Sequence, residues 1–176
     1  MKNMKIEYEN LKKSNQALFP EFKDKFKEIL ESGRYVLGEN VLDFERQFSK
    51  YTNTNFCCGV ASGLDALTIA LRSFDLPLGS EIIVPSNTYI ATILSIVQNG
   101  LIPILVEPDI GTYNIDPTLI ESHITKNTRA IIVVHLYGKL CNMDSIVHLS
   151  KRYEIPIIED CAQAHGAMYR GGVAGS

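Results

Sequence analysis

Residues 81–108 read EIIVPSNTYIATILSIVQNGLIPILVEP, and the hydrophobic pattern changes twice within this stretch. The short apolar run Glu81–Val84 predicts a buried strand, and Ile102–Val106 predicts a second one. Between them the large apolar residues recur at helical spacing, and Asn99-Gly100 is typical of a helix end. These apolar residues are Ile90, Ile93, Leu94 and Val97. The stretch therefore predicts a strand, a helix and a strand in succession.

The same alternation continues along the chain. Further strand-like runs occupy Phe56–Val60, Ala130–Val134 and Ile155–Ile158, with helical patterns between them. Ser62 with Asp65 resembles a capping box, and Asp116-Pro117 is a helix cap followed by a proline. The strands are continuously apolar rather than alternating, which favours a mostly parallel sheet covered by helices on both faces. The predicted fold class is α/β.

The first part of the chain differs because it contains helical patterns alone. One helix ends at Gly33, and a second ends near Tyr51. The apolar faces of these helices carry Phe22, Phe26, Ile29 and Leu30, and then Val41, Phe44 and Phe48. We therefore divide the chain into an N-terminal helical segment, residues 1–55, and the first part of a larger α/β domain, residues 56–176.

The composition is that of an ordinary globular protein, since 45% of the 176 residues are hydrophobic and 21% are charged. The formal net charge is -3 with both signs mixed along the chain, so no basic stripe favours nucleic acid as a partner. No apolar run approaches the roughly 20 residues that cross a bilayer. We therefore expect a cytoplasmic protein without a membrane partner. The four cysteines and four histidines lack the spacing of a metal site, so we expect none.

In a parallel sheet, ligands bind at the carboxyl ends of the strands, and polar residues follow several of the predicted strands here. The turn Ser62-Gly63-Leu64 precedes a helix, and the free N–H groups of Gly63 and Leu64 suit an anion such as a phosphate. A turn of this kind also serves merely to cap a helix. The G-x-G-x-x-G pattern of dinucleotide sites is absent, which disfavours a Rossmann cofactor.

Three further residues at these strand ends suggest a flat, charged ligand. The Tyr89 ring could stack on a planar group or pack on the rim of the sheet. Asp160 closes an apolar strand, where a carboxylate needs a cation or hydrogen-bond donors; capping the next helix is the alternative. Gln163 could reach a second polar atom of the same ligand. Together with the anion-binding turn, these residues indicate a planar, phosphorylated and cationic heteroaromatic, a description that fits pyridoxal 5′-phosphate (PLP).

Several motifs follow one another in order over nearly the whole chain. They are Gly33-Arg34-Tyr35-Val36-Leu37-Gly38, Ser62-Gly63-Leu64-Asp65-Ala66-Leu67, Pro85-Ser86-Asn87-Thr88-Tyr89-Ile90-Ala91-Thr92, Val134-His135-Leu136-Tyr137-Gly138 and Glu159-Asp160-Cys161-Ala162-Gln163-Ala164-His165-Gly166-Ala167. In this set the chain resembles the DegT/DnrJ/EryC1/StrS aminotransferases. The order and spacing make the resemblance more specific than any single motif.

The resemblance implies a role for each residue that matches the family pattern. The amides of Gly63 and Leu64 would hold the cofactor phosphate, and Tyr89 would stack on the pyridine ring. Asp160 would pair with the ring nitrogen, and Gln163 would bond the phenolic oxygen. These roles agree with the chemistry of the residues themselves.

The resemblance also implies a fold, an assembly and a reaction. The fold would be the aspartate-aminotransferase-like large domain (PLP fold type I), incomplete at the C-terminus of this chain, and the enzyme would be a homodimer. The reaction would move an amino group from glutamate to a keto group, expected at C3, of a dTDP-linked keto-6-deoxysugar. Ser62 would belong to the cofactor-binding turn, and Tyr35 would lie near the substrate entrance and contact the sugar.

The lysine that such enzymes use as Schiff-base partner and proton shuttle is not expected within this chain, because the resemblance places it beyond Ser176. We interpret Lys139 as a solvated loop residue, and Lys126 and Lys151 as surface residues. We therefore expect no catalytic residue here and an inactive chain on its own. A sugar dehydratase of the same fold, with histidine in place of the lysine, is the nearest alternative. A non-catalytic binding or interaction protein is another.

Overall fold

The computed structural model describes residue 7 and residues 9–176. They form two compact units, one up to Gln47 and one from Phe48 to Ser176. The boundary falls inside a helix, earlier than the division after residue 55 that the sequence favours. The reason is that the end of this helix packs with the second unit: Thr52 is buried, and the rings of Phe48 and His165 lie 5.9 Å apart between centroids.

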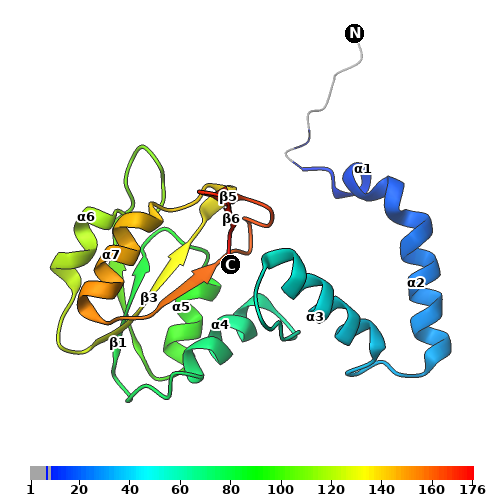
Figure 1. Ribbon diagram of the computed structural model, residues 1–176, viewed down its shortest axis with the longest axis horizontal. Coiled ribbons are helices and arrows are strands. Elements are labelled where there is room, and N and C mark those ends of the chain that lie inside the picture. Colours follow the sequence, from blue (N-terminus) through cyan, green and yellow to red (C-terminus); the bar gives the residue numbers. More distant parts are fainter. Residues whose placement is uncertain (1–6, 8) are drawn as a thin grey trace, which may run out of the picture. The chain divides into compact units, whose positions relative to one another are not determined.

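The N-terminal unit is helical, and its helices follow the colour bar from blue to cyan in Figure 1. It contains α1 (Leu11–Asn15), the short 3-10 helix η1 (Gln16–Leu18), α2 (Phe19–Ser32) and most of α3 (Glu39–Thr52). Gly33 ends α2 in the left-handed region at φ 64°, and its N–H donates to the carbonyl of Leu30. Both predicted helices and the glycine stop are confirmed.

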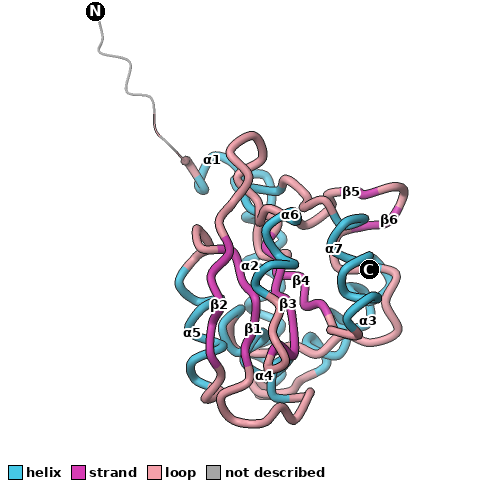
Figure 2. The backbone as a smooth tube through the Cα atoms, turned by 90° about the vertical axis from the view of Figure 1, so that its left-hand side faces the viewer, coloured by secondary structure: helices cyan, strands magenta, loops and turns pink. Residues whose placement is uncertain are grey.

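The second unit is built on a four-stranded parallel sheet. The strands are β1 (Glu81–Pro85), β2 (Ile102–Val106), β3 (Thr128–Val134) and β4 (Ile157–Asp160). Their order across the sheet is β2-β1-β3-β4, as Figure 2 shows. Near the end of the chain, β5 (Met168–Tyr169) and β6 (Gly172–Val173) form a small antiparallel pair.

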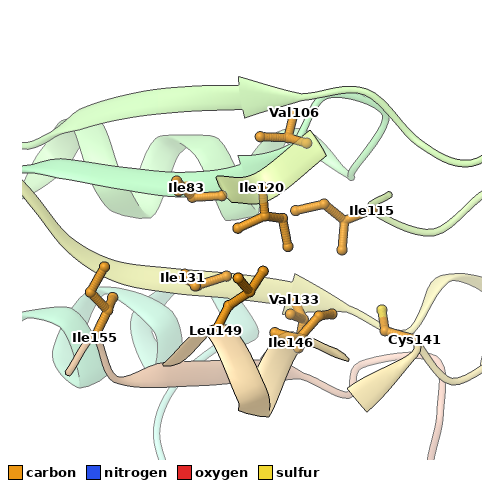
Figure 3. Close-up of a cluster of buried hydrophobic side chains, with 10 residues drawn as sticks. All are labelled: Ile83, Val106, Ile115, Ile120, Ile131, Val133, Cys141, Ile146, Leu149 and Ile155. Atoms are coloured by element: carbon orange, nitrogen blue, oxygen red, sulfur yellow. The ribbon is translucent and has the colours of Figure 1, made fainter. Parts of the chain in front are cut away.

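Helices cover both faces of this sheet, as the continuously apolar strands predict. On one face α4 (Gly63–Arg72) and α5 (Ile90–Gln98) pack over a cluster of buried residues. This cluster contains Leu71, Ile82, Val84, Ile96, Leu101, Ala130 and Ile132. The other face carries the 3-10 helix η2 (Glu121–His123) with α6 (Pro117–Ile120) and α7 (Met143–Tyr153), above the cluster drawn in Figure 3. The predicted α/β architecture is confirmed, and within the described residues no helix is long and apolar enough to span a membrane.

One predicted strand is wrong. Residues 56–60 lie outside the helices and strands, and the side chain of Phe56 is 91% exposed. The apolar run resembles the buried strands in composition, but a strand also requires a neighbour that completes its backbone hydrogen bonds. Among the strands that the structure describes, none pairs with this segment.

A second strand is displaced from its predicted position. The sequence favours Ile155–Ile158, whereas β4 runs from Ile157 to Asp160. Ile155 follows α7 and is still tied to its last turn, because its N–H donates to the carbonyl of Ser150 at 3.0 Å, and Pro156 has no N–H to give. The shift makes Asp160 the last residue of the strand.

Candidate functional site

The carboxyl ends of β3 and β4 lie at one edge of the sheet, and a cavity of about 530 Å³ lies there. Val134 at the end of β3 pairs with Asp160 at the end of β4, so the two strands finish level with each other. The first turns of α4 and α5 form the other walls of the cavity. The lining includes all six residues predicted as cofactor contacts, which are Ser62, Gly63, Leu64, Tyr89, Asp160 and Gln163. The structure thus brings these residues together, and their roles stay a prediction.

The start of α4 presents backbone N–H groups at the cavity. Ser62 is the N-cap, and its hydroxyl accepts the Asp65 N–H at 3.1 Å while donating to the Asp65 carboxylate at 2.8 Å. This cap uses the N–H of Asp65, so those of Gly63 and Leu64 remain at the exposed end of the helix. A Cβ on Gly63 would meet no atom within 4 Å, which leaves room for a ligand against the backbone. The arrangement suits a phosphate.

Asp160 is half-buried and is held by donors on its protein side. Its Oδ2 accepts the hydroxyl of Thr92 at 3.0 Å, and its Oδ1 accepts the N–H of Ala162 at 3.2 Å. The Thr92 hydroxyl is also 2.9 Å from that of Thr88. Sequence reasoning assigned no role to Thr92, although it ends the motif that begins at Pro85. The sequence offered one signal for such a role, the position of Thr92 in a predicted helix that directly follows a strand and therefore lies beside the sheet.

Gln163 is oriented by a loop that follows β3, the 3-10 helix η3 (Leu136–Gly138). Its Oε1 accepts the N–H of Tyr137 at 2.8 Å, so its other amide atom, Nε2, is the donor that it can offer to a ligand. Tyr137 adopts a left-handed conformation with φ 53°, which a non-glycine residue adopts only when its surroundings hold it.

The residue that holds this loop is Asn114, which sequence reasoning missed. Its side chain is buried; its Oδ1 accepts the N–H of Leu136 at 3.2 Å, and its Nδ2 donates to the carbonyl of Lys139 at 2.8 Å. Both ends of the loop are therefore fixed by one amide from a distant part of the chain.

Tyr89 precedes α5 and leaves 75% of its surface exposed. A tyrosine packed on the rim of the sheet would bury its ring, so the exposure disfavours that alternative. The ring is available to cover a planar group in the cavity.

A buried histidine lies behind Asp160, on the other side of β4. His135 accepts the Cys141 N–H at Nδ1 over 3.2 Å, so Nε2 carries the proton and donates to Glu159 at 2.9 Å. This hydrogen bond holds the pKa of Glu159 below its ordinary value, against the opposing effect of burial. Burial raises the pKa of Cys141 and of Cys161 to about 12 each.

Ligand atoms of His135, Glu159 and Cys161 lie within 4.8 Å of one another. The sequence spacing predicts no metal site, because the three residues become neighbours only through the pairing of β3 with β4. The histidine and glutamate already satisfy each other, and the high pKa of Cys161 keeps its thiol protonated. The structure shows a hydrogen-bonded pair of His135 and Glu159 with the Cys161 thiol near it.

The lysines occupy the positions expected of them. Lys139 is exposed, and its Nζ donates to the carbonyl of Gly111 at 3.2 Å. Lys126 and Lys151 are also exposed, so their predicted surface positions are confirmed. Among the described residues that line the cavity there is no lysine. Tyr35 belongs to the N-terminal unit, where its hydroxyl donates to the carbonyl of Leu30, and its substrate contact stays a prediction.

Comparisons with known proteins identify a family. A model of the DegT/DnrJ/EryC1/StrS aminotransferase family matches residues 17–176. The chain is 54% identical over 171 residues to a dTDP-3-amino-3,6-dideoxy-alpha-D-galactopyranose transaminase of Aneurinibacillus thermoaerophilus, covering 97% of this chain and 47% of that protein.

Solved structures of similar proteins also match most of this chain. The X-ray structure of S. venezuelae DesV matches with a TM-score of 0.92 and 44% identity, over 95% of this chain and 45% of DesV. An E. coli GDP-4-keto-6-deoxy-D-mannose-3-dehydratase with bound hydrated PLP matches with a TM-score of 0.80 and 31% identity, over 85% of this chain and 40% of that chain. The chain thus spans about half the length of the curated relatives it matches.

Proposed function

The chain belongs to the DegT/DnrJ/EryC1/StrS aminotransferase family, and from this premise we propose that its strand-end cavity binds PLP for the amination of a nucleotide-linked sugar. One observation carries the proposal. A single cavity of about 530 Å³ combines a helix start suited to phosphate, an exposed aromatic ring, a carboxylate and an oriented amide donor. PLP has a matching group for each of them.

The residues fit the cofactor as follows. The N–H groups of Gly63 and Leu64 would bind the phosphate, within the turn capped by Ser62. Asp160 would face the ring nitrogen and favour its protonated form, because an adjacent anion stabilises a cation. Gln163 would donate from Nε2 to the phenolic oxygen, since its Oε1 is already engaged. Tyr89 would cover one face of the ring.

When bound, PLP supplies an electron sink for the carbon that loses or gains a proton, and it carries the amino group between substrates. The residues that line the cavity would bind and orient PLP. The amine and proton shuttle that the reaction requires would come from a lysine, and no described residue lining the cavity is one.

The proposed substrates are glutamate as amino donor and a dTDP-linked keto-6-deoxysugar aminated at C3. The names of relatives 54% and 43% identical support the dTDP-linked sugar and position C3, since both are transaminases of dTDP-3-amino sugars, whereas glutamate follows from the resemblance to the family. We also infer a homodimer that works in the cytoplasm, and a sugar contact through Tyr35, from the resemblance to the family.

A dehydratase is the second candidate, because the chain is also similar to a sugar 3-dehydratase with PLP bound. The longest in-frame product containing this chain separates the two when it is supplied with glutamate and, in parallel assays, with a dTDP-3-keto- and a dTDP-4-keto-6-deoxysugar, because a 3-dehydratase needs a hydroxyl at C3 beside a keto group at C4. Formation of an amino sugar with 2-oxoglutarate supports the first candidate, and loss of water without an amino sugar supports the second. Neither product would indicate a binding protein.

The direct test of the site is a titration of the 176-residue chain with PLP, followed by absorbance. We expect saturable binding, weakened at least about tenfold in Asp160→Asn, since a hydrogen bond to a charged group contributes about 1.5–3 kcal/mol. Asp75→Asn is the matched control, because Asp75 is exposed beyond the opposite end of α4. Equal binding by all three proteins would overturn the proposed site. Borohydride reduction should leave no stoichiometric adduct on a lysine of this chain.

A further inference from the structure

The feature that the proposed function leaves unused is a buried hydroxyl aimed at Asp160. Thr92 lies in the first turn of α5 and is 1% exposed, and its hydroxyl donates to Asp160 Oδ2 at 3.0 Å. The two residues are 68 positions apart in the sequence. This hydrogen bond therefore ties the helix that follows β1 to the end of β4.

The direction of the hydrogen bonds follows from the protons available. A threonine hydroxyl has one proton, and that of Thr92 is given to Asp160. The contact of 2.9 Å between the hydroxyls of Thr88 and Thr92 must then be a donation from Thr88. Thr88, Thr92 and Asp160 form a chain in which each hydroxyl donates toward the carboxylate.

The other oxygen of Asp160 is also held by a donor, the N–H of Ala162 at 3.2 Å. Every partner that the protein gives to this carboxylate is thus a donor. The lone pairs that remain toward the cavity can only accept, so a ligand atom placed there has to bring a proton.

We propose that Thr92, supported by Thr88, is a positioning residue that aims the Asp160 carboxylate and makes the cavity select a ring with N–H over a ring with C–H at that place. The inference rests on the proposed PLP site. It adds a specificity element that lies outside the cavity lining, because neither threonine lines the cavity.

The experiment compares two ligands, PLP and its 1-deaza analogue, in which a C–H replaces the ring nitrogen. The ratio of their dissociation constants is measured for the wild-type chain and for Thr92→Val, Thr92→Ala, Thr92→Ser and Thr88→Val. Contacts to the phosphate, the ring face and the phenolic oxygen are common to both ligands and cancel in the ratio. Circular dichroism establishes that each variant is folded.

We expect the wild type to bind PLP more tightly than the 1-deaza analogue. In Thr92→Val this preference, measured as the ratio of the two dissociation constants, should fall about tenfold, which corresponds to about 1.4 kcal/mol. Thr92→Ser keeps the hydroxyl and should restore the preference. Thr88→Val should lose less, because Thr92 keeps its own proton for Asp160. A purely structural role would weaken both ligands equally and leave the ratio unchanged.

An unchanged ratio in Thr92→Val overturns the inference, and Thr92→Ala takes its place if the valine variant does not fold. A serine variant that fails to restore the ratio overturns it as well. If the wild type binds neither ligand, it is the proposed cofactor site that fails. If the wild type prefers PLP and both Thr92→Val and Thr92→Ala retain that preference, the proposed cofactor site is supported and the proposed role of Thr92 is wrong.

Discussion

Glu159 owes its lowered pKa mainly to one neighbour, His135, and the N–H of Gly175 adds a smaller effect. The hydrogen bond from His135 is the largest cause of its lowered pKa, and burial acts in the opposite direction. Asp160, the next residue, meets a hydroxyl and a backbone N–H instead. Two consecutive carboxylates thus have separate surroundings, and only the second reaches the proposed cofactor cavity.

The lowered pKa of Glu159 makes stability depend on pH. A carboxylate whose pKa is lower in the folded state stabilises that state above its unfolded pKa, and the contribution is lost as pH falls through the folded pKa. We expect Glu159→Gln to lower the free energy of unfolding at neutral pH, with the difference from wild type shrinking below the ordinary glutamate pKa of 4.5.

Urea unfolding over a series of pH values measures this difference. Glu107→Gln, at an exposed acid, is the matched control. A difference between Glu159→Gln and wild type that stays constant with pH would show that the hydrogen bond does not depend on the charge of Glu159.

The residues that bear recognisable chemistry were predictable from the sequence, and those that support them were not. Asp160, Gln163 and Tyr89 follow predicted strands, so their position at the sheet edge could be inferred. Thr92 and Asn114 act across 68 and 22 to 25 positions, respectively. A sequence pattern carries no information about which distant partner a threonine or asparagine will meet, so these two were missed.

At the scale of elements, local signals predicted the helices better than the strands. Gly33 ends α2 and Ser62 caps α4, because capping depends on neighbouring residues alone. The segment 56–60 has the composition of a strand but no strand beside it in the described sheet. Strand formation depends on a partner that local composition does not reveal.

The cap of α4 should be measurable. Ser62→Ala removes the side chain that accepts the Asp65 N–H, and we expect a loss of about 1 kcal/mol in the free energy of unfolding. Ser73→Ala, at the other end of the same helix, should cost less than about 0.5 kcal/mol. Urea unfolding followed by circular dichroism compares them, and equal losses would contradict the capping role.

At the scale of the molecule, the two cores share the strands β1 and β3. Ile131 and Ile132 are adjacent on β3 and fully buried, yet they belong to clusters on opposite faces of the sheet. Ile82 and Ile83 divide in the same way on β1, so the helices on the two faces pack against the same two strands.

We expect Ile131→Ala and Ile132→Ala each to cost about 2–5 kcal/mol in the free energy of unfolding, by cavity formation in a packed core. Both should shift one common cooperative transition in urea, because both layers pack against the same two strands. Leu105→Ala on the edge strand β2, where the side chain is 48% exposed, is the control and should cost less. Two separate transitions in either variant would mean that the faces unfold independently.

The pairing of Val134 with Asp160 decides which of two acids serves the cofactor cavity. Side chains alternate along β4, so Glu159 turns toward His135 and Asp160 toward Thr92. A slip of one position between β3 and β4 would exchange these directions. The place of Asp160 would then be taken by Glu159 or Cys161, and the place beside His135 by Ile158 or Asp160. The chemistry of the cavity thus depends on the register in which β4 pairs with β3.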